Sequence, residues 1–490
     1  MGINTAKYML SALLLLGSLT AFSIGQPRRH LLPRNIISQR AAKAQRAISY
    51  TGEKRQLVVL ASFSDLDFRQ EEPIPLWDSI FNMPNFTEEP YYGSVHDFFH
   101  DQSYGKFDLH FDLHAIKVNN KYATYGSTKT DDANAALLIL ALADSLKNKV
   151  TDWAPYDWDE DGYIDQILVI YAGMGQNDGG DRNTIWPNQA SLTIYEHKPV
   201  TVSSNGKDFI IDKYGCIPEY GRTTYATFGT ICHEFGHCLG LPDIYYDNLS
   251  ILENWDIMDH GNYSKNGYCP PCYSAFERKR LGWLDIQELT DPTSVTQMPA
   301  LSDEPVAYLI RNDNYPNEYY ILENRQKKGW DQSLPGNGLL IFHIDYDEEL
   351  WHLGIPNDYR DNHYTIIPAN NLSYTTFSYG WAYPYGSKDS LTNNSAPAAT
   401  LRHAAKDGTM LMSKPITNIK VDDNGLVAFD FMGGELAGLA NTQQSTLSRQ
   451  PSAIYDLRGR IVSGQPATSG IYIVRYADGT IRKKTNVCHY

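Results

Sequence analysis

The chain has 490 residues, of which 42% are hydrophobic and 20% are charged, and this composition predicts a soluble globular protein of more than one domain. Its formal net charge of −15 argues against nucleic acid or an anionic membrane surface as a partner. Composition and charge leave the fold open.

The first 25 residues predict a secretory signal peptide. Lys7 supplies a basic start, Met9 to Leu19 is mostly apolar, and small residues lead up to a cleavage site near Gln26. A membrane anchor is the alternative, although the apolar run is short for a bilayer span. Residues 26–50 are basic and poor in large apolar side chains, which indicates a linker or a short pro-segment. We therefore expect a protein that is secreted or attached to the outer cell surface, with no transmembrane segment in the mature chain.

Residues 51–285 predict the first folded domain, in which strands and helices alternate as in an α/β protein. Apolar or alternating runs predict strands at Gln56–Phe63, Phe107–Val118, Gln166–Ala172 and Phe209–Cys216. Helical spacing of apolar residues predicts helices at Tyr91–Tyr104, Ala133–Leu146, Tyr225–Leu239 and Pro271–Trp283, the second of them opened by Asp131 or Asp132.

An acidic segment, DWDEDGYID at residues 157–165, matches the first part of a calcium-binding loop. The expected ligands are the side chains of Asp157, Asp159, Asp161 and Asp165 and the backbone carbonyl of Tyr163. Leu168 occupies the twelfth position, where an EF-hand has a glutamate, and a strand rather than a helix follows. The segment therefore predicts a structural calcium loop attached to a strand, with an acidic surface turn as the alternative.

The strongest motif is HExxHxxGxxD, which begins at His233. On a helix, His233 and His237 project from one face and can bind one zinc ion. Glu234 lies close to that metal but is free to act as a base. Gly240 can end the helix, and the turn after it can bring Asp243 back as a third ligand, which leaves one position open for water. The alternative is a buried helix with two hydrogen-bonded histidines.

Residues beyond the motif supply further candidates. Met258 lies in a turn that can form an apolar floor under a zinc site. Tyr263 and Tyr268 are candidate donors to the oxyanion of the transition state. Glu277, in the last helix of the domain, remains an alternative to Asp243 as the third zinc ligand.

Six cysteines are present, and export would permit disulfides, but the sequence does not pair them. The motif Cys269-Pro-Pro-Cys272 leaves a redox pair, a local disulfide and half of a metal site open. Cys232 and Cys238 flank the zinc motif and point in different directions on a helix, so we expect them to pack rather than to pair.

Residues 286–432 predict a β-sandwich, because short β-rich runs such as Tyr308–Arg311, Glu318–Arg325 and Gly338–Asp345 are separated by Asn, Pro and Gly. His343 and Asp345 lie on one of these runs and are interpreted as a structural polar pair. Residues 433–451 are small and polar and indicate a linker, and residues 452–490 predict a small C-terminal β module.

From about Gln56 to Met432 the chain resembles the immune inhibitor A family of secreted zinc metallopeptidases. The resemblance rests on seven segments: Ser103–Gly105, the 157–165 loop, Thr184–Pro187, the zinc motif, Trp255–Met258, Glu323–Arg325 and Gly338–Asp345. It implies a zincin-like catalytic domain, endopeptidase activity on proteins, catalytic zinc and stabilising calcium. Asn188 departs from the family, which tends to carry His after Trp-Pro.

The tail from about Ser452 resembles the C-terminal sorting modules of the type IX secretion system of Bacteroidetes. This resemblance implies that secretion machinery is a partner of the tail.

The sequence as a whole predicts a secreted zinc endopeptidase with Glu234 as its general base. One rival interpretation is a non-catalytic, zinc-stabilised cell-surface adhesin or binding protein, although such a protein would not need Glu234. A secreted hydrolase of another class, such as a glycosidase, is the second rival.

Overall fold

The structure of the protein is a computed structural model. It describes residues 50–126, 134–181, 183–221, 228–246, 249–358, 361–372, 377–434, 451–455, 462, 470–476 and 481–486. The expected signal peptide, nearly all of segment 26–50, most of linker 433–451, the proposed helix-opening Asp131 and Asp132, and Cys488 lie outside the described residues.

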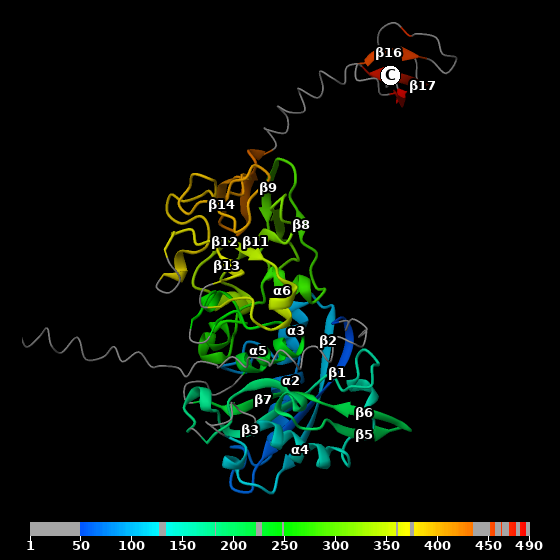
Figure 1. Cartoon of the computed structure of the whole chain (residues 1–490), viewed down its shortest axis with the longest axis vertical. Coiled ribbons are helices and arrows are strands. Elements are labelled where there is room, and N and C mark those ends of the chain that lie inside the picture. The colour runs from blue at the N-terminus through cyan, green and yellow to red at the C-terminus, as the bar shows by residue number, and fades with distance from the viewer. Residues whose placement is uncertain are drawn as a thin grey trace, which may run out of the picture.

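A five-stranded sheet in the order β2-β1-β3-β7-β4 forms the centre of the first unit (Figure 1). Its strands are β1 (Gly52–Ser62), β2 (Phe107–Lys117), β3 (Ile167–Met174), β7 (Lys213–Tyr220) and β4 (Asn188–Ser191). The first four are parallel and β4 is antiparallel to β7. Residues Leu57–Ala61 of β1 are fully buried, as expected for a parallel sheet that is covered on both faces.

The single strand predicted at Phe209–Cys216 is wrong, because the chain forms two strands there. β6 (Lys207–Ile211) pairs with β5 (Val200–Ser204) in a separate ribbon, whereas β7 joins the central sheet. Asp212 separates them, and its carboxylate accepts hydrogen bonds from the backbone N–H and hydroxyl of Thr193. A polar anchor therefore interrupts what reads in the sequence as one apolar run.

In the described residues of the first unit the chain forms five α-helices. They are α2 (Pro73–Asn82), α3 (Val95–Gln102), α4 (Ala135–Leu146), α5 (Phe228–Cys238) and α6 (Ala275–Arg280). The helix predicted at Pro271–Trp283 is shorter than expected, because Ser274 caps it and two prolines precede the cap. α5 packs against α3 through Phe235 and Phe99, whose ring centroids are 5.0 Å apart.

Two further sheets follow within residues 286–432, with the orders β13-β12-β11-β10-β8 and β14-β15-β9. Their strands are β8 (Gln287–Glu288), β9 (Thr293–Met298), β10 (Tyr308–Arg311), β11 (Glu318–Arg325), β12 (Gly338–Asp345), β13 (Tyr364–Ile366), β14 (Ile416–Val421) and β15 (Val427–Phe431). Side chains from both sheets, such as Ile341 and Phe429, share one apolar core. A short helix, α7 (Glu348–His352), follows β12.

The five-stranded sheet of this second unit is buried on both faces. On β11, Tyr320 and Leu322 belong to the core between the two sheets, whereas Tyr319 and Ile321 belong to the large core of the first unit. This alternation follows from the period of two along a strand. The apolar interior is therefore continuous across residue 285, and Figure 1 shows α5 and α6 near the junction of the two units.

A buried ion-pair cluster joins the units at the same place. Arg325 of β11 donates to Asp331 at 2.6 and 2.7 Å and to Glu323 at 3.0 Å, and all three side chains are fully buried. Glu323 also accepts from the N–H of Ala275 at the start of α6. The cluster thus connects the second unit to the helix that ends the first.

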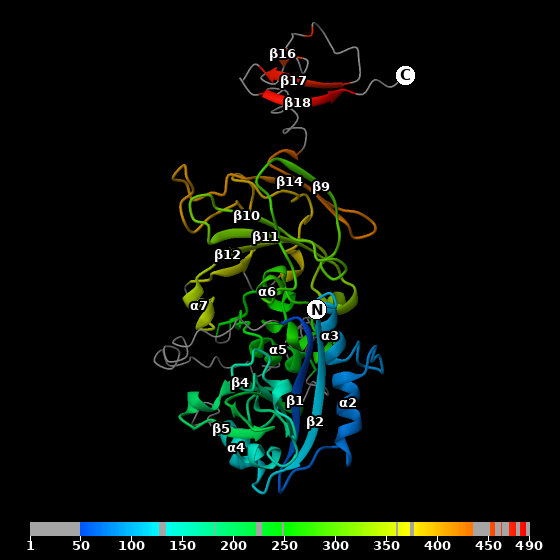
Figure 2. The same ribbon diagram turned by 90° about the vertical axis from the view of Figure 1, so that its right-hand side faces the viewer.

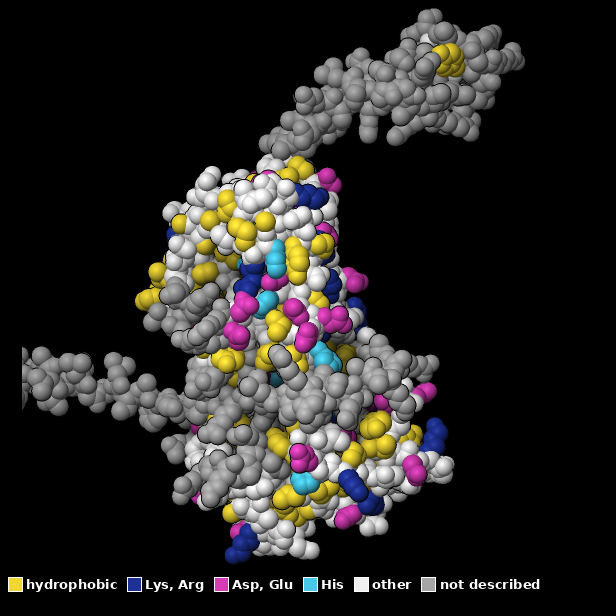
Figure 3. All heavy atoms as spheres, in the orientation of Figure 1, with side chains coloured by type: hydrophobic (Ala, Val, Ile, Leu, Met, Phe, Trp, Pro, Cys, Tyr) yellow, Lys and Arg dark blue, Asp and Glu magenta, His cyan; other side chains and the backbone are white. Residues whose placement is uncertain are grey.

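The strands β16 (Pro451–Tyr455), β17 (Gly470–Tyr476) and β18 (Ile481–Asn486) form a three-stranded sheet near the C-terminus (Figure 2). None of the helices in the described part of the chain has the length and apolar character needed to span a membrane. On the face shown in Figure 3, the described Lys and Arg side chains are scattered among acidic ones, consistent with the negative net charge.

Candidate metal centre

The end of α5 sets the geometry of the site. Gly240 has a φ of +89°, and its N–H donates to the carbonyl of His237 while the N–H of Leu241 donates to that of Gly236. This pair of hydrogen bonds is a Schellman motif, which glycine enters at low cost. The chain therefore reverses within two residues of the helix, and Asp243 returns to the face that carries His233 and His237.

The two histidines are oriented by backbone carbonyls. The Nδ1 of His233 lies 2.8 Å from the carbonyl oxygen of Ile257, and the Nδ1 of His237 lies 2.8 Å from that of Leu241. A carbonyl only accepts, so both Nδ1 atoms carry a proton, and Nε2 is the ring nitrogen that faces Asp243. The turn that brings back Asp243 therefore also orients His237.

The three predicted zinc ligands converge. Asp243 Oδ1 lies 3.2 Å from Nε2 of His233 and 3.2 Å from Nε2 of His237. Burial lowers the pKa of His237, but Asp243 outweighs it and raises that pKa to about 9. Burial also raises the pKa of Asp243, yet the two imidazoles hold it well below its usual range. The three side chains therefore lie close together, and the protonation of each depends on the charge of the others.

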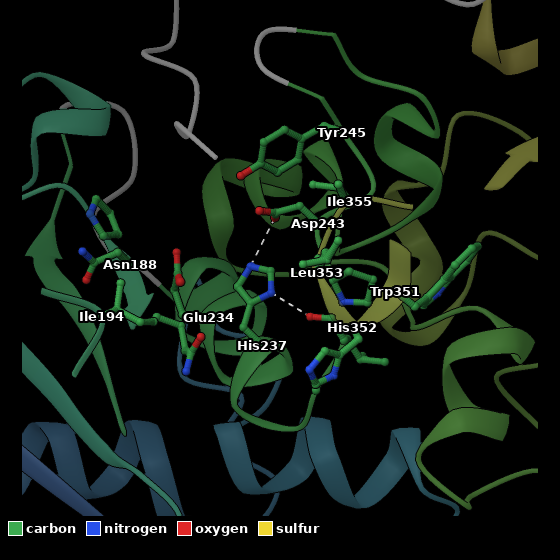
Figure 4. Close-up of a pocket in the computed structure, with 16 residues that line it drawn as sticks. Asn188, Ile194, Glu234, His237, Asp243, Tyr245, Trp351, His352, Leu353 and Ile355 are labelled. Atoms are coloured by element: carbon green, nitrogen blue, oxygen red, sulfur yellow. Dashed lines mark hydrogen bonds and ion pairs between the residues drawn. The ribbon is translucent and has the colours of Figure 1, made fainter. Parts of the chain in front are cut away.

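Glu234 lies beside this group and lines the same cavity (Figure 4). Its side chain is 6% exposed. Burial raises the pKa of Glu234, which the two neighbouring histidines partly offset. A carboxylate with a raised pKa, close to the ligand set but not part of it, is suited to accept and return a proton.

Met258 forms the floor under α5, as its position in the sequence predicts. Its side chain is fully buried, and a Cβ added at Gly236 would lie 2.7 Å from its sulfur. The glycine inside the helix is therefore explained by the close approach of the methionine. The carbonyl of Met258 also accepts from the N–H of Ile244, which fixes the residue after Asp243.

The remaining candidate residues differ in how close they lie to the predicted zinc ligands. Tyr263 is close enough to Glu234 for that carboxylate to contribute to a pKa that burial raises to about 12. Tyr268 packs edge to face on Tyr91, and neither of these two tyrosines is among the residues that line the cavity. Glu277 lies in the capping box of α6 and is absent from the ligand group, which contains Asp243 instead.

The acidic loop brings together part of its predicted set. Ligand oxygens of Asp157, Asp159 and Asp165 lie within 4.8 Å of one another. Burial, with a smaller contribution from the other two carboxylates, raises the pKa of Asp165 to about 7 against the opposing hydrogen bond from the N–H of Trp158. Asp161 is not in this group, and its Oδ1 accepts from the N–H of Tyr163 at 2.7 Å.

None of the five described cysteines forms a disulfide with another described cysteine, and this holds for Cys269 and Cys272. Within the described residues the CxxC motif is therefore neither a disulfide nor part of either metal-ligand group. Cys232 and Cys238 are buried, as expected for packing residues.

Two features of the site lie outside the HExxHxxGxxD motif and are not predicted by it. Tyr245 is buried and hydrogen-bonds the carboxylate of Asp243. In the sequence, only its position two residues after Asp243 indicates that Tyr245 belongs to the site. One wall of the cavity comes from Trp351–Ile355, in the second unit, and no local pattern points to it. Asn188 lies on the opposite wall, and both polar atoms of its side chain are buried without a hydrogen-bond partner among the described residues.

The family model described as "Immune inhibitor A peptidase M6, catalytic domain" matches residues 77–284. Both ligand groups lie in that range, so the resemblance seen in the motifs is confirmed for this part of the chain. The match ends before the second unit and the tail, and the resemblance of the tail to a sorting module stays a prediction.

Immune inhibitor A of Bacillus thuringiensis subsp. alesti is 30% identical over 26% of this chain and 21% of that protein. The Pre-pro-metalloprotease PrtV of Vibrio cholerae serotype O1 is 23% identical over 41% of this chain and 25% of that protein. The chain thus spans a quarter or less of the length of these relatives. A crystal structure of wild-type OgpA from Akkermansia muciniphila overlaps 64% of this chain and 93% of that chain at 13% identity, with a TM-score of 0.28, which is too low to inform fold or function.

Proposed function

We propose that this chain is a secreted zinc-dependent endopeptidase that hydrolyses peptide bonds in proteins. The observation that supports this most strongly is the convergence of His233, His237 and Asp243 with Glu234 beside them, inside the stretch that matches a peptidase family model. The names of the matched relatives, one of them a metalloprotease, agree with a metal-dependent reaction.

The ligand set fits zinc. Two imidazole nitrogens and one carboxylate oxygen are a common protein set at catalytic zinc sites, and they leave a position open. The hydrogen bonds from both Nδ1 atoms to backbone carbonyls hold Nε2 toward the ion. When bound, zinc supplies the Lewis acidity that makes water nucleophilic near neutral pH.

Glu234 is the proposed general base. Its carboxylate accepts the proton of the attacking water and returns it to the amine that leaves. Because burial raises the pKa of Glu234, its protonated form persists long enough to serve as the acid in that second step. Tyr263 is the proposed donor to the oxygen of the scissile carbonyl.

Calcium at the acidic loop is a further part of the proposal. Three clustered carboxylates repel one another, and an oxygen-binding cation would relieve that repulsion and hold the loop against β6. We expect calcium chelation to lower the melting temperature of the wild type, and Asp165→Asn to abolish that response. Asp161→Asn is the control, and an equal effect of both variants would contradict this ligand assignment.

The proposed location is outside the cell or on its outer surface. It rests on the signal-like first 25 residues and on the resemblance of the tail to a sorting module, through which secretion machinery would be a partner. Protein or peptide substrates are expected, and neither nucleic acid nor a membrane span is part of the proposal.

The decisive experiment combines metal analysis with casein digestion by the purified chain, with and without a chelator. We expect about one catalytic zinc, activity that the chelator abolishes, and a Glu234→Gln variant that keeps zinc but loses hydrolysis. The exposed Glu304→Gln variant should behave as wild type. Full activity in zinc-loaded Glu234→Gln would overturn the mechanism. Zinc binding without digestion of casein or any peptide would instead support the binding-protein alternative.

A further inference from the structure

We propose that segment Trp351–Asn357 of the second unit forms the specificity wall of the cleft, and that it selects peptides with an uncharged aliphatic side chain beside the scissile bond. This inference rests on the proposed peptidase function and names the substrate class of the same site.

The cleft is a cavity of about 210 Å³. Figure 4 shows Glu234, His237 and Asp243 between two groups of side chains, with Asn188 and Ile194 on one side and residues of the specificity wall on the other. A peptide whose carbonyl reaches the ligand group must therefore place a neighbouring side chain against one of these walls.

The specificity wall is rigid because a helix and its cap hold it. Gly354 has a φ of +71°, its N–H donates to the carbonyl of Trp351, and the N–H of Ile355 donates to that of Leu350. This is again the Schellman arrangement, here at the end of α7. Trp351 anchors it by packing on Phe276 of α6 at a centroid distance of 5.6 Å.

A second connection ties the wall to the third ligand. Asn357 is fully buried, and its Nδ2 donates to the carbonyl of Ile244 at 2.8 Å and to that of Tyr364 at 2.9 Å. Ile244 directly follows Asp243, and its N–H donates to Met258. The wall and the ligand group therefore keep a fixed separation, as a selective pocket requires.

The lining chemistry favours aliphatic side chains. Ile194, Leu353 and Ile355 are half buried and face the cavity with apolar surface still to cover. Among the described lining residues the only acids are Glu234 and Asp243, and there is no Lys or Arg. A Lys side chain would meet no acid outside the ligand site, and a Glu side chain would meet only the exposed His352 on this wall. An aliphatic side chain would instead gain roughly 25 cal/mol for each Å² that it buries.

The test uses quenched-fluorescent peptides that are identical except for Leu, Lys or Glu at the residue on either side of the cleavage site. At one of these positions we expect kcat/KM for Leu to exceed that for Lys and Glu by about tenfold or more. Ile355→Lys should reverse the order of Leu and Glu at that position, and Leu353→Lys serves if the first variant does not fold. Met410→Lys, an exposed apolar residue outside the cleft, is the matched control.

Binding is measured separately, as the fluorescence anisotropy of the same peptides with Glu234→Gln. This readout keeps the two proposals apart, because preferential binding of the Leu peptide without any cleavage by the wild type would sustain the specificity wall and reject the peptidase. Equal kcat/KM for Leu, Lys and Glu at both positions would overturn the specificity wall, and so would an unchanged order in folded Ile355→Lys and Leu353→Lys.

Discussion

Asp256 and Glu277 are two carboxyl groups in the interior, 0% and 1% exposed, that raise or lower the pKa of one another, and Asp256 Oδ2 and Glu277 Oε1 have no hydrogen-bond donor among the described residues. Asp256 Oδ1 accepts from the N–H of Met258, and Glu277 Oε2 accepts from that of Ser274. The pair therefore connects the turn under α5 to the start of α6. Two buried carboxylates without a donor repel each other, and a proton on one of them both removes that repulsion and supplies a donor for the other.

This pair predicts a loss of stability in alkaline solution. Burial raises the pKa of both groups, that of Glu277 from 4.5 to about 7. A folded-state pKa above the unfolded value means that the favourable contribution is complete in acid and disappears as pH rises through about 7. Glu277→Gln keeps a donor and an acceptor but cannot ionise. Between pH 5 and 9 it should lose less unfolding free energy than wild type, by on the order of 1–3 kcal/mol.

Calorimetric melting of the metal-free chain across that pH range measures the difference. Glu304→Gln, an exposed substitution, should follow the wild-type profile. Parallel profiles for wild type and Glu277→Gln would show that the pair carries no titrating proton.

The helix-ending glycines allow a matched comparison. Gly240 and Gly282 both have positive φ, of +89° and +78°, both close Schellman motifs, and neither has an atom within 4 Å of an added Cβ. Alanine at either position should cost about 1–2 kcal/mol of unfolding free energy. Only Gly240→Ala should also weaken zinc binding, because Leu241 and Asp243 follow it. Urea unfolding and competition with a chromophoric chelator measure the two effects, and equal zinc affinities in both variants would contradict this role of the turn.

Tyr245 is expected to support the third ligand. Because its hydroxyl hydrogen-bonds Asp243, Tyr245→Phe should lower zinc affinity by about 10–100-fold while leaving the fold intact. Tyr383→Phe is the control, since that hydroxyl is also buried but has no hydrogen-bond partner among the described residues. Zinc titration of the apo-protein provides the measurement, and unchanged affinity in Tyr245→Phe would remove the residue from the metal site.

Arg325 is expected to hold the two units together. Its guanidinium makes two hydrogen bonds to Asp331 and one to Glu323, a geometry that an ammonium group does not reproduce. Arg325→Lys should therefore cost about 3–5 kcal/mol in urea unfolding. Arg311→Lys on the neighbouring strand alters an exposed pair with Glu288 and should cost about 1 kcal/mol or less. Similar costs for both would argue against a role for burial.

Local patterns in the sequence predicted the elements whose structure depends only on residues that are close together in the chain. Strands β10, β11 and β12 begin and end at the predicted residues, because each is a short apolar run between turn residues. The group of His233, His237 and Asp243 could also be predicted from the sequence, because helical spacing places the two histidines on one face and a glycine allows the turn that returns the aspartate. Helix α2 was missed although a signal was present: Pro73 opens it, and Trp77, Ile80 and Phe81 form its buried face.

Other features depend on contacts between distant residues and have no local signature. The specificity wall reaches the cleft only because Asn357 binds Ile244 and Trp351 packs on α6. The choice of Asp243 over Glu277 likewise follows from the turn after Gly240 and from the fact that the α6 cap already occupies Glu277. Asp161 lies outside the group of Asp157, Asp159 and Asp165, and nothing in the local pattern of alternating aspartates distinguishes it from them.

The sheet β13-β12-β11-β10-β8 of the second unit is buried on both faces, and this has a consequence for any truncated form of this protein. Family similarity stops at residue 284, yet Phe276 is covered by Tyr364 and Trp351 from beyond that point. A fragment that ends at residue 284 would expose these contact surfaces. It would also lack Trp351–Ile355, which forms one wall of the cavity beside the ligand group. We expect such a fragment to self-associate, because the stretch that matches the family model depends on the second unit to cover its apolar surface.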